Sequence, residues 1–272
     1  MDRQLLRATW FSLDGKVLGT VSTAPVASHG VIMGRFEDGN FLVVEQVPTY
    51  VERDGYRLAN RLTKRVSIDA VVVDTLGSFE EARAYPIRRE YEIPFLFPSV
   101  GVYVAAGMRL YARYPSTFTI HVVPADSIAE PRLLIGAPTR QAQRSVVDRA
   151  IDEKRADARG PGRKMRLRID VQRKVGILPQ FGNSIVVGPE ATVWVPDYDG
   201  AHPGSHVEWT VFAENGAVLG SVRMHEAFLP SQISSGRIVG VWRDGLGVET
   251  VRGYDLVMDN RNAAPAADSV GR

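Results

Sequence analysis

The sequence predicts an all-β fold, and three observations support this prediction. Short apolar segments recur along most of the chain and are separated by Gly, Asn and Asp. These segments are rich in β-branched and aromatic residues, which are typical of strands. Several of them are joined by Asn-Gly or Asp-Gly, which favour tight hairpins because such turns require positive φ. We therefore expect many short strands connected by hairpins.

In the first half of the chain, Val31–Met33 and Phe41–Val44 flank the turn Glu37–Asn40, a pattern typical of a hairpin. Ser67–Val73 is a β-branched run, and Thr117–Val123 alternates weakly between apolar and polar residues. Each of these segments has the length and composition of a strand.

In the second half the predicted hairpins are clearer. Three turns separate the apolar segments, and they contain Gly188-Pro189, Asn215-Gly216 and Asp244-Gly245. The strands that we expect around these turns are 185–187, 192–195, 209–212, 218–219, 238–242 and 248–254.

Composition restricts the class of protein. The 272 residues carry a net charge of +2, with 44% hydrophobic and 24% charged residues, which are ordinary values for a globular chain. The absence of cysteine excludes disulfides, thiolate metal sites and a cysteine nucleophile. Arg7 and Asp14 interrupt the N-terminal apolar residues, so we expect no signal peptide. The longest apolar stretch, 95–107, is shorter than the roughly 20 residues that span a bilayer, so we expect no membrane span.

Two segments of the chain resemble each other. Trp10–Val21 and Thr210–Val222 both contain an aromatic residue, an acid or amide before Gly, then Val-Leu-Gly, a hydroxyl residue and Val. Repeats of about 40–50 residues are typical of propeller blades, so the separation fits four or five blades with one insertion. The alternative is that two unrelated hairpins share common turn chemistry.

The segment 138–176 is expected to be this insertion. Between Thr139 and Lys174 it holds 12 basic and five acidic residues. Thr139–Arg159 has the apolar spacing of a helix, and Gly160-Pro161-Gly162 would end it. The tail 259–272 is rich in Asn, Ala and Asp and is expected to be disordered.

Trp209–Val222, together with Val239–Glu249 and Val251–Tyr254, resembles the C-terminal blades of bacterial six-bladed β-propellers of the NHL-like or TolB-like type. The resemblance implies a β-propeller over 1–258, a helical insertion and a periplasmic or exported protein. Members of that family have six blades, whereas about four and a half are recognisable here, namely a half blade at 4–21 and blades at 30–79, 91–135, 181–222 and 232–257. We therefore expect a piece of a longer exported protein; a misassigned start codon and a partner that closes the ring are the alternatives.

An incomplete ring would also leave strand edges unpaired, and such edges allow self-association.

No motif in the sequence assigns a reaction. The five histidines do not form a metal-binding pattern, and no serine lies in a Gly-x-Ser-x-Gly elbow. We therefore assign no catalytic residue, no metal ligand and no cofactor. The basic segment Arg155–Lys174 contains no aromatic residue on which bases could stack, which argues against a nucleic-acid partner.

Three residues are the candidates for ligand binding. Trp194 offers an aromatic surface, while Asp197 and Arg243 are charged residues at strand ends, where a propeller presents its rims. Trp194 is also one of four tryptophans, with Trp10, Trp209 and Trp242, for which packing between sheets is the favoured interpretation. The sequence as a whole favours a non-enzymatic binding or interaction protein for an unknown protein or small ligand. The alternative is a metal-dependent hydrolase or lyase of the six-bladed propeller type.

Overall fold

The computed structural model describes residues 7–12, 14–22, 30–53, 56–88, 91–94, 101–114, 119–126, 132–136, 184–197 and 205–256. Within these ranges the regular structure consists of β-strands and one short turn, η1 (Pro189–Ala191). The all-β prediction is therefore confirmed. The predicted helical insertion 138–176 and the predicted disordered tail 259–272 lie outside the described residues.

The described strands form five antiparallel sheets, and within each sheet strands that are consecutive in the chain lie side by side. The first sheet is a hairpin of β1 (Arg7–Phe11) and β2 (Val17–Ser22). The second contains β3 (Gly30–Arg35), β4 (Phe41–Arg53), β5 (Tyr56–Val66), β6 (Val72–Arg88) and β7 (Tyr91–Pro94). The third contains β8 (Val102–Ala106), β9 (Arg109–Tyr114), β10 (Thr119–Pro124) and β11 (Arg132–Gly136). The fourth contains β12 (Val186–Val187), β13 (Val193–Pro196), β14 (His206–Phe212) and β15 (Val218–His225), and the fifth contains β16 (Phe228–Ser234), β17 (Arg237–Arg243) and β18 (Glu249–Asp255).

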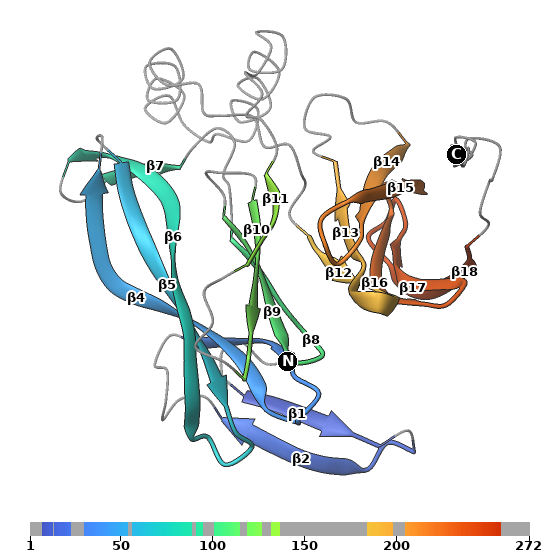
Figure 1. Ribbon diagram of the computed structural model, residues 1–272, viewed down its shortest axis with the longest axis horizontal. Coiled ribbons are helices and arrows are strands. Elements are labelled where there is room, and N and C mark those ends of the chain that lie inside the picture. Colours follow the sequence, from blue (N-terminus) through green and yellow to red (C-terminus); the bar gives the residue numbers. More distant parts are fainter. Residues whose placement is uncertain are drawn as a thin grey trace, which may run out of the picture.

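The sheets follow one another along an open arc, from the blue hairpin β1–β2 to the red strands β17 and β18 (Figure 1). The first strands of successive sheets are in contact, β3 with β8, β8 with β12, and β12 with β16. Within the described ranges each sheet is open and the sheets do not close into a barrel or ring.

Strand direction alternates in a meander, so the turns that join first to second strands and third to fourth strands lie on the same side of every sheet. The Glu37 N–H, in the turn after β3, donates to the Gly107 carbonyl oxygen in the turn after β8, at 2.9 Å. Glu214, in the turn after β14, pairs with Arg109 of β9. We call this side of the arc the turn face.

The repeat between the first hairpin and β14–β15 is visible in the strand register. Phe11 pairs with Val17 and Phe212 pairs with Val218, and each pair is preceded by a one-residue bulge. Gly15 and Gly216 adopt φ values of 84° and 89° in the two turns. The β5–β6 hairpin, which joins the third and fourth strands of the second sheet, has a bulge at the same place.

Two boundaries predicted from the sequence are wrong. The run Ser67–Val73 is not a strand but mostly the turn between β5 and β6, closed by the Ser67 N–H donating to the Val71 carbonyl at 2.9 Å. Ala70 takes a left-handed φ of 59° in that turn without a glycine, so the usual turn signal is missing. The blade expected from Tyr91 begins only at Val102, because β7 pairs with β6 of the preceding sheet.

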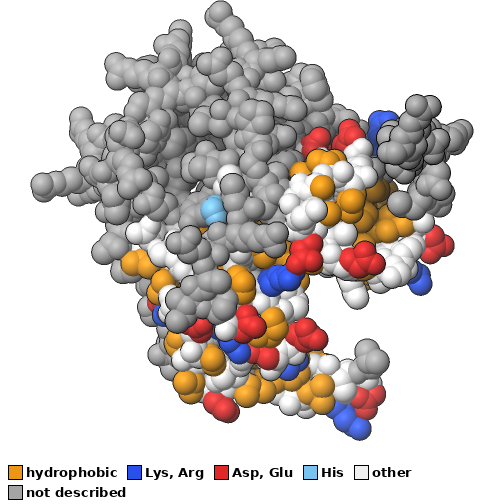
Figure 2. Space-filling view, in the orientation of Figure 1, with side chains coloured by type: hydrophobic (Ala, Val, Ile, Leu, Met, Phe, Trp, Pro, Cys, Tyr) orange, Lys and Arg blue, Asp and Glu red, His pale blue; other side chains and the backbone are white. Residues whose placement is uncertain are grey.

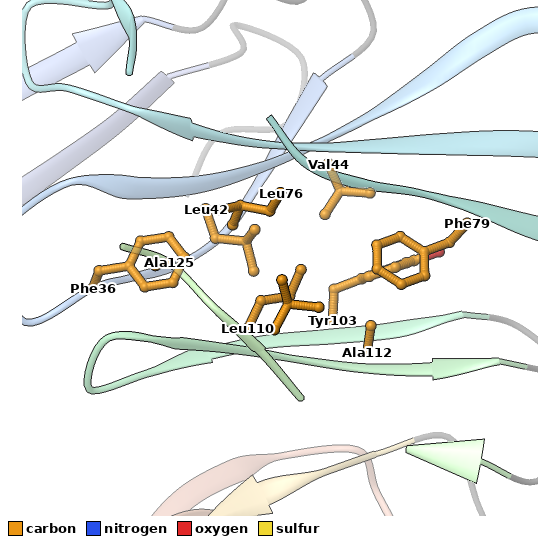
Figure 3. Packing of buried hydrophobic residues seen from close by; sticks show 10 residues of the cluster. Phe36, Leu42, Val44, Leu76, Phe79, Tyr103, Leu110, Ala112 and Ala125 are labelled. Carbon is orange, nitrogen blue, oxygen red and sulfur yellow. The ribbon is translucent and has the colours of Figure 1, made fainter. Parts of the chain in front are cut away.

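The cores lie between successive sheets. Between the second and third sheets, apolar side chains of the two sheets point toward one another, and Leu42 and Leu110 are fully buried (Figure 3). Burying a leucine side chain stabilises the fold by about 1.5–3 kcal/mol. Trp194 and Trp209 are buried between the fourth and fifth sheets, and Trp242 packs against them. Trp10 packs on the core beneath the first hairpin, so all four tryptophans contribute to packing between sheets.

Candidate functional site

A hollow of about 900 Å³ opens at the turn face where the third, fourth and fifth sheets meet. The third sheet contributes the β8–β9 turn, the fourth contributes the end of β12 with η1, and the fifth contributes the end of β16. The contact between first strands therefore brings three distant parts of the chain to one site. The volume lies in the range of small-molecule sites, which is about 300–1,000 Å³.

A strained turn forms one lip of the hollow. Glu190 and Ala191 have φ values of 54° and 56°, and the Thr192 N–H donates to the Pro189 carbonyl oxygen at 3.0 Å. This is the backbone of a type I′ turn, which usually requires Asn or Gly at both central positions. Non-glycine residues in left-handed backbone are costly and occur preferentially at functional sites.

The residue before this turn must be small. A Cβ added to Gly188 would lie 2.7 Å from Thr192 Oγ1 and 3.1 Å from Trp194 Nε1. Trp194 Nε1 donates to Thr192 Oγ1 at 3.1 Å, which fixes the indole against the strand. Gly188 thus lets the lip approach the buried tryptophan closely.

One charged group of the hollow, the Arg109 guanidinium, is neutralised by an ion pair. The Arg109 guanidinium lies 2.7 Å from Glu214 Oε1, and it hydrogen-bonds the Tyr111 hydroxyl. Its hydrogen bond to Tyr111 helps to raise the pKa of Arg109, so it stays a cation. Burial raises the pKa of Tyr111, which keeps the phenol protonated. These three side chains form a network that joins the third and fourth sheets.

The remaining lining combines apolar and hydrogen-bonding groups. Met108, Val187 and Ile233 supply apolar surface, while Ser234 and Ser235 supply hydroxyl groups that donate and accept. Asp126 and Gln232 also line the hollow. This set can bind a small molecule through hydrogen bonds and apolar contact.

The structure does not bring the three sequence-predicted ligand residues together. Trp194 is buried between sheets, as described above. Asp197 Oδ1 accepts a hydrogen bond from Thr210 Oγ1 at 3.1 Å, and Arg243 forms an exposed ion pair with Glu249. Asp197 directly follows β13 and Arg243 is the last residue of β17. Both strands start at the turn face, so both residues lie on the opposite side of the arc.

A stacked row of side chains also lies on the side opposite the turn face. The His225 and Trp242 rings are 4.6 Å apart, and the Arg252 guanidinium lies 4.1 Å from the Trp242 ring centroid. The Ala227 N–H donates to His225 Nδ1 at 3.1 Å. Trp242 is therefore covered by protein groups, and this row joins the fourth and fifth sheets as packing.

The hollow could not be recognised from a motif, because its residues share none. The nearest signal is positional: Gly107, Gly188 and Ser235 each follow the first strand of their sheet. Aligning the sheets strand by strand would have grouped them.

Within the ranges that the structure describes, no three His, Cys, Asp or Glu side chains gather closely enough to hold a metal ion. In the same ranges, no helix has the length and apolar character needed to cross a bilayer.

No protein-family model matches the chain, and no curated protein matches it. Among solved structures, it is similar to a "putative exported protein" of Bacteroides fragilis NCTC 9343, at 11% identity and a TM-score of 0.42. The match covers 89% of this chain and 62% of that one, so the chain spans less than two thirds of the other protein's length.

Proposed function

We propose that this chain is a non-enzymatic binding protein built as part of a β-propeller, and that it binds a small uncharged ligand in the hollow at its turn face. The single observation that carries this proposal is the hollow of about 900 Å³ shared by three sheets. The side-by-side first strands and the repeated outer hairpins support the propeller architecture.

The lining favours an uncharged ligand. A free anion would need an unpaired cation, but the Arg109 charge is matched by Glu214. Among the described residues of the lining, a cation would find Asp126 as the one acid. Hydroxyl and amide groups on Ser234, Ser235 and Gln232 can instead exchange hydrogen bonds with a neutral polar molecule, while the apolar side chains cover its carbon skeleton.

Two further properties belong to this proposal. The resemblance to six-bladed propellers supports an exported protein that is longer than this chain. The β18 edge supports self-association, because every residue of that strand is exposed.

The test is a ligand-detected NMR screen with three matched panels of small molecules, which are neutral polyols and amides, dicarboxylates, and diamines. We expect binding from the neutral panel. The variant Ser235→Trp places an indole in the hollow and should abolish that binding. The matched control Ala217→Trp adds the same side chain to an exposed turn outside the lining and should leave binding unchanged.

Binding that survives Ser235→Trp would show that the hollow is not the site. Binding restricted to dicarboxylates or diamines would contradict the ligand class. The melting temperature of both variants should equal that of the wild-type chain, since both positions are exposed.

A further inference from the structure

A second feature of the turn face is a set of exposed aliphatic pairs. Val17–Leu18, Val72–Val73 and Val218–Leu219 directly follow the turns of three hairpins that carry a bulge at the same place, β1–β2, β5–β6 and β14–β15. Their exposed fractions range from 39 to 65%. In the space-filling view the first hairpin forms an arm beside an open notch, with hydrophobic side chains along it (Figure 2).

The register shows why these pairs are exposed at equivalent places. In each hairpin the bulged residue is the second of the pair, namely Leu18, Val73 and Leu219. A bulge protects an outer strand from pairing with other chains, but this role does not require an aliphatic side chain. The repeated aliphatic character is therefore a separate feature, and it offers a partner apolar contact area at each of the three hairpins.

The pairs share one face of the molecule. The turns before Val72 and Val218 join third to fourth strands and lie at the turn face with the hollow. Arg35, beside the turn after β3, lies 5.8 Å from the Trp10 ring of the first hairpin, which places that hairpin tip beside the second sheet. Leu246 is also exposed, but its turn joins the second and third strands of the fifth sheet and lies on the side opposite the turn face.

The charges around the pairs indicate the kind of partner. The described turns of the turn face contain one lysine, Lys16, and seven acidic residues, namely Asp14, Glu37, Asp38, Asp69, Asp126, Glu190 and Glu214. Three of these acids form ion pairs, with Lys16, Arg65 and Arg109. Counting these cations together with Arg35 and Arg237, which border turns of the same face, acids outnumber bases by seven to five. A second copy of this face, or an anionic membrane, would be repelled.

We propose that the turn face docks a cationic polypeptide segment, whose aliphatic side chains cover the exposed pairs and whose Lys or Arg side chains face the surrounding acids. Charge complementarity selects this occupant, and the aliphatic pairs supply contact area. This inference goes beyond the proposed function, since it does not require the hollow to be filled.

The test uses a short fluorescent peptide of alternating Lys and Leu, with Glu-Leu and Lys-Ser peptides of equal length for comparison. Fluorescence anisotropy with the full chain should show binding of the Lys-Leu peptide alone, weakening as salt rises. Val218→Ser combined with Leu219→Ser should weaken binding about tenfold, from lost apolar contact. Asp69→Asn should weaken it about threefold. The control Leu246→Ser removes an exposed leucine on the side opposite the turn face and should leave the affinity for the Lys-Leu peptide unchanged.

Equal weakening by Leu246→Ser would overturn the proposal, because binding would then be unspecific apolar contact. Equal binding of the Lys-Ser peptide, or no binding of the Lys-Leu peptide, would also overturn it. Ser235→Trp should bind the peptide like the wild-type chain, so failure of the small-ligand site and failure of this docking surface are distinguishable.

Discussion

The strained lip of the hollow makes a prediction whose sign is unusual for a glycine substitution. Ala191 lies in left-handed backbone with a φ of 56°. A residue with a Cβ pays about 1–2 kcal/mol in that conformation. Glycine removes this strain, but it costs about 0.5–1 kcal/mol because the unfolded chain gains freedom. We therefore expect Ala191→Gly to stabilise the fold by about 0.5–1 kcal/mol.

The assay is urea unfolding followed by tryptophan fluorescence, since Trp194 and Trp209 are buried in the neighbouring core. For a chain of this size the gain corresponds to a melting temperature higher by about 2 °C. The control is Ala217→Gly, at an exposed position whose φ is not positive, where glycine should destabilise by about 0.5–1 kcal/mol.

Equal destabilisation by both substitutions would refute the reasoning, because Ala191 would then not be strained. If the lip holds the ligand as proposed, Ala191→Gly should also bind the neutral ligand more weakly, since a freer turn must be ordered on binding.

Two further predictions concern the packing between the second and third sheets. Leu110→Ala empties a fully buried site and should destabilise the fold by about 2–5 kcal/mol in urea unfolding, whereas Leu246→Ala, at an exposed turn, should stay within about 0.5 kcal/mol. Burial acts to raise the pKa of Asp38, but hydrogen bonds from the Asn40 N–H and from Arg65 outweigh it and lower the pKa below the ordinary 3.8. Stability from Asp38 is therefore present above pH 3.8 and is lost as pH falls through the lowered pKa. Asp38→Asn should remove part of the acid sensitivity seen in melting temperature from pH 5 to pH 3; an unchanged pH profile would contradict the assignment.

The hairpins could be predicted from sequence where a turn carried its own chemistry. Gly15 and Gly216 occupy positive φ, and the two hairpins around them form in the same register. The turn at Ala70 escaped prediction because an alanine takes the left-handed position there, within a run of β-branched residues that is typical of a strand. Local propensity is a weak guide where tertiary packing imposes the backbone.

The hollow could not be predicted, because it depends on contacts between sheets. Arg109 and Glu214 meet although they are far apart in the sequence and belong to no shared motif. Trp194 was a candidate for ligand binding because of its residue type alone. Its place between the fourth and fifth sheets follows from the alternation of β13, which no single-residue argument reveals.

The most direct test of the account is to map a bound neutral ligand on the ¹⁵N-labelled chain. The account predicts that the backbone amides of Gly107, Gly188 and Ser235 shift together with a single affinity, since these residues bring three sheets to one hollow. The amides of Gly220 and Gly253, which do not line it, should stay in place. Shifts confined to one sheet, or centred on Gly220 and Gly253, would contradict a site shared by the three sheets.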